Sequence, residues 1–187
     1  ELVDLIVRSF SPAPERIIDI GTGSGCIALA LKKGFPNAQV TGIDIHPGAL
    51  DVARANGEAN HLALEWMMAD ALSTDWTEVL NGRGRGRVLV VSNPPYVPRS
   101  DERELEAHVL DHEPHVALFV PDSDTPKYSR AIAGTAANVL HAGDELWFEG
   151  HHLYTPSTAA MIDAMGFRSV ESLIDLSGNT RFIRAAK

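Results

Sequence analysis

The chain has 187 residues, of which 44% are apolar and 22% charged, a composition typical of one globular domain with a buried core rather than of a disordered segment. Lys and Arg number 16 and Asp and Glu 25, so the formal charge of −9 argues against nucleic-acid binding through electrostatics alone. The single cysteine, Cys26, excludes an intrachain disulfide and favours a reduced, cytoplasmic setting, and no apolar run approaches the ~20 residues that a membrane helix needs.

Apolar β-branched runs alternate with stretches of helical periodicity along the chain. In chain order we predict a helix that ends before Pro12, a strand at 16–20, a glycine turn at 21–25, a helix at 26–34, a strand at 39–43, a helix at 47–60, strands at 62–68 and 87–91, a helix at 127–140, a strand at 145–149, a helix at 155–166, and strands at 167–174 and 180–185. Runs that are apolar on both faces predict a parallel sheet covered by helices on each side. The short connection between the last two strands predicts an antiparallel pair.

A glycine-rich loop, Gly21-Thr22-Gly23-Ser24-Gly25, lies where the first predicted strand turns into a helix. Glycines at such a turn let the backbone approach a ligand closely. A dinucleotide site has the spacing Gly-x-Gly-x-x-Gly, but Cys26 stands at the position of its third glycine. Asp19 brings a negative charge toward the loop, which suits the cationic methionine end of S-adenosylmethionine better than a diphosphate. A tight turn without a ligand is the alternative.

Two carboxylates follow the next two predicted strands. Asp44 lies 19 residues after Gly25, where its side chain can accept hydrogen bonds from both hydroxyls of a ribose. Asp70, at the end of the following strand, is placed to hydrogen-bond an adenine amino group, with Ala71 packed on the ring. Each aspartate could instead cap a strand end or a turn. With the glycine loop, they predict a nucleoside pocket at the carboxyl edge of a parallel sheet.

The loop Asn93-Pro94-Pro95-Tyr96 directly follows the fourth predicted strand. Two consecutive prolines cannot continue a strand ladder and have no N–H to donate, so they stiffen the loop. The loop offers two acceptors, the Asn93 side-chain oxygen and the Pro94 carbonyl, and then an aromatic ring at Tyr96. A rigid turn without a chemical role is the alternative.

These acceptors suit the methylation of a planar nitrogen. An amide or aryl NH2 group is a poor nucleophile because its lone pair is delocalised. Two acceptors on its two N–H bonds draw electron density onto the nitrogen and align its lone pair with a methyl carbon, a gain of positioning and preorganised electrostatics. No strong general base is needed before transfer, since the product cation is acidic. We expect Tyr96 to pack against the planar target group.

Several stretches together share the pattern of one family: 19–30, Asp44 with Ala53 and Asn56, 91–98, 113–118, Phe148-Glu149 and 178–181. On these residues the chain resembles the release-factor glutamine methyltransferases, the HemK/PrmC family of class I methyltransferases. The resemblance covers nearly the whole chain. The Asn-Pro-Pro-Tyr element by itself also occurs in DNA enzymes that methylate amino groups, whereas the combination is more specific.

The resemblance implies an α/β, Rossmann-like class I S-adenosylmethionine-dependent methyltransferase with a mostly parallel seven-stranded sheet and an antiparallel last strand. It implies methyl transfer from S-adenosylmethionine, leaving S-adenosylhomocysteine, to the side-chain amide of the glutamine in the Gly-Gly-Gln loop of peptide-chain release factors. Asn93, Pro94, Pro95 and Tyr96 would hold that glutamine. No metal is expected. The residues implied for S-adenosylmethionine binding are Asp19, Gly21, Thr22, Gly23, Ser24, Gly25, Asp44, Ile45, Asp70, Ala71 and Asn93.

Two departures from the family pattern qualify this expectation. Family members carry an N-terminal helical domain that helps to hold the release factor, and we interpret residues 1–187 as the single catalytic domain without it. Donor binding should survive that loss, whereas affinity for the protein substrate should suffer. In addition, residues 121–126 occupy a segment that is often glycine-rich, and His151 and His152 follow Glu149 unusually, which alters the rim of the pocket.

Other signals and functions were weighed against this interpretation. Histidines at helical spacing, His108, His112 and His115, stand among acidic residues and indicate a solvated face rather than zinc. An amino methyltransferase acting on adenine or cytosine in DNA or RNA is one alternative, and it would need base flipping and a basic cleft. A nucleotide-binding domain without catalysis is the other. Three arginines alternate with glycines near the start of the fourth predicted strand, which predicts a flexible surface turn. A contact with RNA or an acidic partner is the alternative for these residues: Arg83, Arg85 and Arg87.

Overall fold

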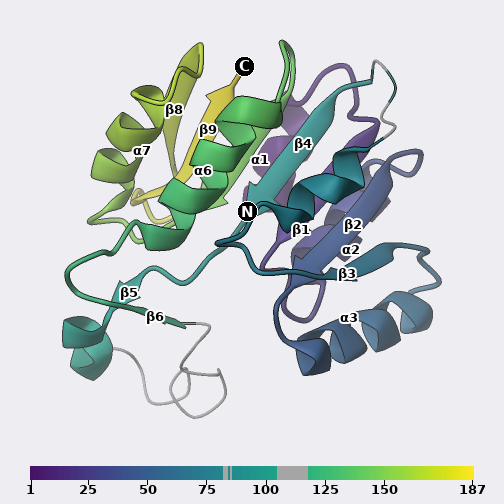
Figure 1. The fold of residues 1–187 in the computed structure, drawn as a ribbon, viewed down its shortest axis with the longest axis horizontal. Helices are drawn as coiled ribbons and strands as arrows, with labels where there is room; N and C mark the ends of the chain where they lie inside the picture. The colour runs from purple at the N-terminus through teal and green to yellow at the C-terminus, as the bar shows by residue number, and fades with distance from the viewer. Residues whose placement is uncertain (82–83, 85, 105–117) are drawn as a thin grey trace.

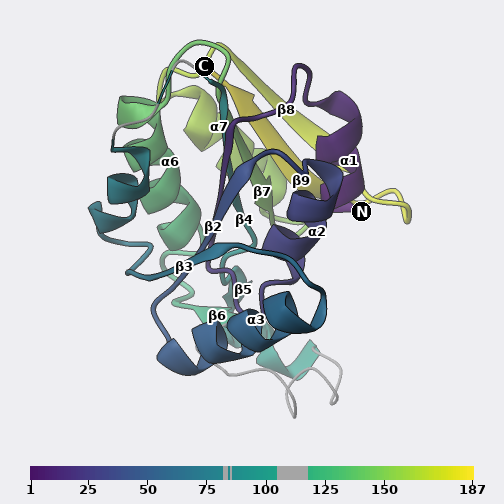
Figure 2. The same ribbon diagram turned by 90° about the vertical axis from the view of Figure 1, so that its right-hand side faces the viewer.

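The computed structural model describes residues 1–81, 84, 86–104 and 118–187, in which helices cover both faces of a central seven-stranded sheet (Figures 1 and 2). Its strands are β1 (Arg16–Ile20), β2 (Gln39–Asp44), β3 (Glu65–Met68), β4 (Val88–Ser92), β7 (Glu145–Glu149), β8 (Ser169–Ile174) and β9 (Thr180–Ala186). Their order in the sheet is β3-β2-β1-β4-β7-β9-β8. The strands from β3 to β7 are parallel, and β9 runs antiparallel to both β7 and β8. This confirms the mostly parallel sheet with an antiparallel last strand.

The helices of the described residues divide between the two faces of the sheet. They are α1 (Leu2–Ser9), α2 (Cys26–Gly34), α3 (Pro47–Ala59), α6 (Lys127–Val139) and α7 (Thr155–Asp163), with 3-10 helices η1 (Asp75–Leu80) and η2 (Arg99–Glu104). Figure 2 shows α1 and α2 on one face and α6 on the other. Among the described residues no helix is both long enough and apolar enough to cross a membrane.

Strand β4 shows why the sheet is covered on both sides. Val88 and Val90 pack into the core beneath α6 and α7, while Leu89 and Val91 pack into the core beneath α1 and α2. All of these side chains are fully buried. A central parallel strand has no solvent face, so its sequence is apolar at consecutive positions instead of alternating.

Several features differ from the sequence prediction. Helix α7 ends at Asp163 rather than at 166, and β8 begins at Ser169 rather than at 167. Strand β3 begins at Glu65 rather than at 62, because the Leu62 N–H donates to the Gly57 carbonyl (3.0 Å) and so completes the end of α3. A small parallel sheet of β5 (Val97–Pro98) and β6 (Phe119–Val120) was not predicted. Figure 1 shows that β5 and β6 lie beyond the end of β4. Strands this short leave no periodicity to detect.

Candidate active site

The predicted ligand-binding residues all lie at one edge of the sheet, where the parallel strands end. The chain passes from β1 outward to β2 and β3, then returns to β4 on the other side of β1. Ligands of open α/β sheets bind outside the carboxyl ends of the strands at such a reversal. The Gly21–Gly25 loop follows β1, and the Asn93–Tyr96 loop follows β4, so the two flank this point.

The glycine loop presents open backbone at this edge. Gly21 and Gly23 have φ of +72° and +55°, and a Cβ built on either would meet no protein atom within 4 Å. Glycine adopts such positive φ values without the strain that a side chain adds. The N–H groups of Gly21 and Thr22 donate to the Ile43 carbonyl at 2.8 and 2.9 Å, which ties the loop to β2. Ser24 closes the loop, with its carbonyl accepting a hydrogen bond from Asn56 Nδ2 (2.9 Å).

Asp19 lies beneath this loop and is fully buried. Its Oδ2 accepts hydrogen bonds from the Thr22 hydroxyl (2.7 Å) and the Ala28 N–H (3.1 Å). Its Oδ1 is also buried and has no hydrogen-bond partner among the described residues. Burial raises the pKa of Asp19 to about 6, against the two hydrogen bonds, and the Asp44 carboxylate adds to the rise. An unpartnered buried acceptor costs free energy, so Asp19 favours a ligand that brings positive charge or N–H donors.

Asp44 ends β2 and connects it to the glycine loop. Its Oδ2 accepts a hydrogen bond from the Gly23 N–H and its Oδ1 one from the His46 N–H, both at 2.9 Å. These bonds fix the carboxylate beside the loop, and each oxygen keeps a second lone pair for a ribose hydroxyl. Ile45, the next residue, is 51% exposed and offers an apolar contact at the same strand end.

Asp70 and Ala71 lie in the turn after β3. Asp70 Oδ1 accepts a hydrogen bond from the Leu72 N–H (2.8 Å), so this side chain caps the turn. The Ala69 N–H donates to the Asp44 carbonyl (3.2 Å) and keeps the turn beside β2. Ala71 is half-buried against the core. The adenine-binding role of this pair stays a prediction.

The Asn93–Tyr96 loop is anchored at the end of β4. The buried Ser92 hydroxyl donates to the Ile20 carbonyl (2.6 Å), which joins the residue before Asn93 to the residue before the glycine loop. Asn93 is exposed, whereas Pro94 is buried. Asn93 is therefore an exposed residue that directly follows a fixed strand end, and the register partner of that strand end, Ile20, directly precedes Gly21.

Tyr96 contacts the part of the sheet formed by β7 and β9. Its hydroxyl accepts a hydrogen bond from Arg181 Nη2 (3.1 Å), and the same nitrogen lies 2.7 Å from Glu149 Oε1. No role was predicted from the sequence for Glu149 or Arg181. Both lie in stretches that carry the family resemblance, 148–149 and 178–181, and that was the signal that could have identified them.

A small cavity of about 20 Å³ lies behind Tyr96. A volume of this size holds about one water molecule and is too small for a glutamine side chain. The cavity is therefore not the acceptor site in this structure. Its walls are formed by Tyr96, Thr125, Pro126, Ser129, Phe148, Glu149, Gly150, His151, Tyr154, Thr155, Thr158 and Ile183.

His151 and His152, which follow Glu149, lie close to aromatic rings in the structure. His151 packs in an aromatic group, with ring centroids 6.2 Å from Tyr96, 4.6 Å from His152 and 5.2 Å from Tyr154. Among the described residues no three His, Cys, Asp or Glu side chains are placed to hold a metal. The three histidines considered for zinc lie outside the described residues, and the solvated face expected for them stays a prediction: His108, His112 and His115.

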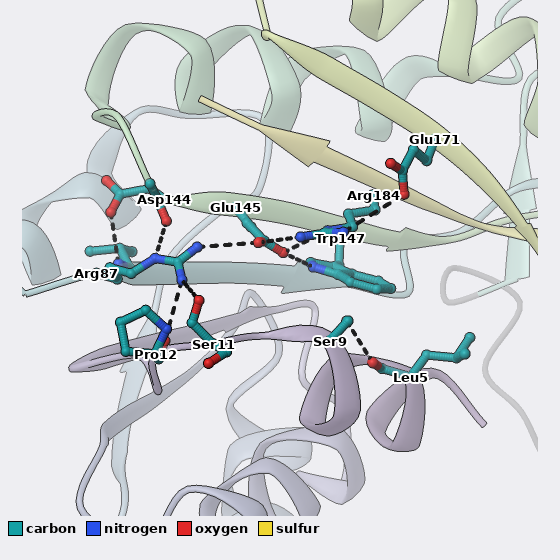
Figure 3. A network of polar contacts seen from close by, with 12 residues as sticks. Leu5, Ser9, Ser11, Pro12, Arg87, Asp144, Glu145, Trp147, Glu171 and Arg184 are labelled. Atoms are coloured by element: carbon teal, nitrogen blue, oxygen red, sulfur yellow. Dashed lines mark hydrogen bonds and ion pairs between the residues drawn. The ribbon is translucent and has the colours of Figure 1, made fainter.

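Arg87 is not part of a flexible surface turn, which corrects the prediction made for it. Figure 3 shows its guanidinium between β7 and the segment after α1. Its Nη2 lies 3.2 Å from Glu145 Oε1, its Nη1 donates to the Ser11 carbonyl (2.7 Å), and it stacks on Phe10 at 4.2 Å. Arg87 therefore stabilises the fold at the opposite end of β4 from Asn93. The other arginines of this group, Arg83 and Arg85, lie outside the described residues.

Two features of the site fit S-adenosylmethionine. The unpartnered Asp19 Oδ1 can accept hydrogen bonds from the positively charged methionine end of the donor. Gly21 and Gly23 leave open the space that the Cβ of any other residue would fill. Asp44 supplies carboxylate acceptors beside the same loop. A diphosphate on the glycine loop would meet the Asp19 carboxylate with like charge, which disfavours a dinucleotide.

Solved structures with the same fold are methyltransferases. An O-methyltransferase family protein from Burkholderia thailandensis has a TM-score of 0.65 at 15% identity, over 99% of this chain and 55% of that chain. The ribosomal protein L11 methylase of Lactobacillus delbrueckii subsp. bulgaricus has a TM-score of 0.62 at 16% identity, over 99% of this chain and 75% of that chain. The chain therefore has the α/β fold of these methyltransferases.

Sequence comparison gives the family. The family model described as "Methyltransferase small domain" matches residues 3–115, and the chain belongs to that family. The release factor glutamine methyltransferase of Bacteroides thetaiotaomicron is 40% identical over 185 residues, 99% of this chain and 64% of its own length. The enzyme of the same name from Flavobacterium psychrophilum is 37% identical over 188 residues, 98% of this chain and 64% of its own length. These relatives confirm the resemblance, and the chain spans about 64% of their length.

Proposed function

We propose that this chain transfers a methyl group from S-adenosylmethionine to the side-chain amide nitrogen of the glutamine in the Gly-Gly-Gln motif of peptide-chain release factors. The observation that carries the proposal is the Ser92–Ile20 hydrogen bond (2.6 Å), which fixes the Asn93 loop beside the glycine loop. The two segments that we propose to bind the donor and the acceptor follow Ile20 and Ser92, which are register partners in β1 and β4. The names of the relatives support the choice of release factors.

The glycine loop and three strand ends would hold the donor. Asp19 would meet the methionine end, Asp44 the ribose hydroxyls, and Ile45 with Asp70 and Ala71 the adenine. S-adenosylmethionine, when bound, supplies an electrophilic methyl carbon on a sulfonium. The chain itself contributes carboxylates and open backbone in fixed places, so little reorganisation accompanies binding.

The Asn93 loop would hold the acceptor amide. The Asn93 side-chain oxygen and the Pro94 carbonyl accept hydrogen bonds from the two N–H groups of this amide and turn its nitrogen lone pair toward the donor. Pro94 is buried, so its carbonyl is fixed by packing. Both acceptors are in place before the reaction, and their effect is therefore electrostatic preorganisation rather than base catalysis. Tyr96 would pack against the flat amide.

The partner and the setting follow from this reaction. A release factor works in translation, so we place the chain in the cytoplasm, and we propose that residues 1–187 form one catalytic domain. The cofactor is consumed as S-adenosylmethionine and released as S-adenosylhomocysteine.

The proposal is tested by incubating the protein with methyl-labelled S-adenosylmethionine and a release factor, and in parallel with duplex DNA or RNA. We expect label in the release factor, and loss of that label when its Gly-Gly-Gln glutamine is replaced by alanine. Label in nucleic acid and none in the release factor would make the chain an amino methyltransferase of bases. Calorimetry with S-adenosylmethionine and with NAD separates the cofactors, and tight binding of NAD alone would refute methyl transfer.

Asn93→Ala is the variant that addresses the chemistry. With donor saturating, turnover should fall by about 100-fold, the size of effect seen when one preorganised hydrogen-bond partner is removed. Asn138→Ala is the matched control, because Asn138 is exposed on α6 and its side chain donates only to the Gly134 carbonyl (2.9 Å) among the contacts of the described residues. Unchanged turnover of Asn93→Ala would contradict the role given to this loop.

A further inference from the structure

We infer that Arg181 is a positioning residue that holds Tyr96, and with it the acceptor-binding loop, in the geometry needed for methyl transfer. The inference rests on the proposed function, since it names a residue that tunes the same site. Arg181 lies on β9, far from the loop in sequence, and no motif of the glycine loop or of residues 93–96 includes it.

The contacts of the Arg181 side chain carry the inference. Its Nη2 donates to the Tyr96 hydroxyl at 3.1 Å and lies 2.7 Å from Glu149 Oε1. Its guanidinium carbon is 6.0 Å from the centroid of the Tyr96 ring. Arg181 is 31% exposed and Glu149 22%, so the pair is partly shielded from water. The Glu149 carboxylate holds the Arg181 guanidinium in place, and the guanidinium in turn holds the Tyr96 hydroxyl.

The backbone around Arg181 is itself fixed. The Gly150 N–H donates to the Arg181 carbonyl (2.8 Å), which continues the β7–β9 ladder past Glu149. The turn before β9 is ordered by Asp175, whose Oδ1 accepts hydrogen bonds from the Ser177 N–H (2.9 Å) and the Asn179 N–H (2.8 Å). Arg181 therefore reaches Tyr96 from a rigid hairpin.

The loop depends on such an anchor for a physical reason. Pro94 and Pro95 have no N–H groups, so this part of the loop cannot donate backbone hydrogen bonds to the sheet. Ser92 fixes its start and Val97 its end, where β5 begins. The Tyr96 side chain, held from β9, sets the direction in which the loop crosses between these points.

Arg184 provides a matched control on the same strand. It too is a partly exposed β9 arginine (27%) that lies 2.7 Å from a β7 glutamate, Glu145. Arg184 faces the network of Figure 3 and not Tyr96. Removing either arginine breaks one ion pair between β7 and β9, and of the two only Arg181 contacts Tyr96.

The first readout is kinetic. Arg181→Gln should lower kcat about tenfold with the affinity for S-adenosylmethionine unchanged by calorimetry, while Arg184→Gln keeps kcat. Tyr96→Phe should lower kcat to the same extent, and adding it to Arg181→Gln should cause no further loss, because both changes remove the same hydrogen bond between Arg181 and Tyr96. Additive losses, or a raised KM for the release factor at unchanged kcat, would overturn the inference in favour of direct contact with the protein substrate.

The second readout needs no substrate. Amide hydrogen exchange at Tyr96 and Val97 should quicken about tenfold in Arg181→Gln and stay at the wild-type rate in Arg184→Gln. Equal rates in the two variants would overturn the inference. If Arg181→Gln does not fold, Tyr96→Phe gives the same comparison. A wild-type protein that leaves the release factor unlabelled refutes the proposed function, and the exchange result still decides whether Arg181 holds the loop.

Discussion

Ser92 and Ile20 are the last residues of neighbouring strands, and the buried hydroxyl of Ser92 donates a 2.6 Å hydrogen bond to the Ile20 carbonyl. The two residues are also register partners in the β1–β4 ladder. The bond lies one residue before the glycine loop and one residue before Asn93. It therefore couples the position of the two loops on which the proposed reaction depends.

Ser92→Ala should destabilise the protein and loosen this coupling. The change removes one buried hydrogen bond, and we expect the free energy of unfolding to fall by about 1–2 kcal/mol in urea denaturation. Ser157→Ala is the control, because the Ser157 hydroxyl donates to the Tyr154 carbonyl in an exposed position. A loss no larger than that of the control would show that the Ser92 bond contributes little.

Gly21→Ala tests whether the glycine loop binds the donor. Gly21 and Gly178 have φ of +72° and +83°, and a Cβ on either would meet no protein atom within 4 Å. Alanine should therefore cost each site about 1–2 kcal/mol of folding stability through backbone strain alone. Calorimetry should show donor affinity reduced at least about tenfold in Gly21→Ala and unchanged in Gly178→Ala. Equal affinities would place the donor elsewhere.

Asp19→Asn should change how stability depends on pH. The pKa of Asp19 is about 6 in the folded chain and 3.8 when unperturbed, so between these values the folded state binds the proton more tightly. The free energy of unfolding therefore falls as pH rises from 3.8 to about 6, by about 3 kcal/mol, and below 3.8 this loss is absent. Asparagine does not ionise, so the variant lacks this fall.

The measurement is urea unfolding of wild type and Asp19→Asn across this pH range. Subtracting the two profiles cancels the other titrating groups, which the proteins share. The difference should favour the wild type progressively less as pH rises and should level off above about pH 6. Parallel profiles would mean that the Asp19 pKa is the same in the folded and unfolded chain.

Glu145→Ala should lower the free energy of unfolding without a direct effect on the candidate active site. Glu145 is 2% exposed and accepts hydrogen bonds from Arg87, Arg184 and Trp147 Nε1 (Figure 3). Removing it takes the buried anion from two partly buried cations and leaves Arg184 only the exposed Glu171, at a cost of about 3 kcal/mol in thermal or urea unfolding. Glu171→Ala, at an exposed carboxylate 3.7 Å from Arg184, should cost no more than about 0.5 kcal/mol. Similar losses would show that burial of Glu145 does not matter.

Much of the sheet could be predicted because its strands carry local signals. The run Val88–Val91 is apolar at every position, and β1 and β7 have the bounds that the sequence predicts. The start of β3 was wrong, since Leu62 donates its N–H to α3 instead of to a neighbouring strand. The hydrogen-bond partner of the Leu62 N–H lies in α3, outside the apolar run of the strand. The apolar run therefore cannot show where the strand begins.

The sequence by itself determined the strand–turn–helix units, the glycine loop and the proline-stiffened Asn93 loop, because propensity, periodicity and turn chemistry act over a few residues. The tertiary structure decided which side chains meet across the sheet. Arg181 reaches Tyr96, and Arg87 packs on Glu145, only because β9 inserts between β7 and β8 and β4 lies beside β7. Such contacts join residues separated by 85 and 58 positions, and their geometry follows from strand order and register, which no local pattern encodes.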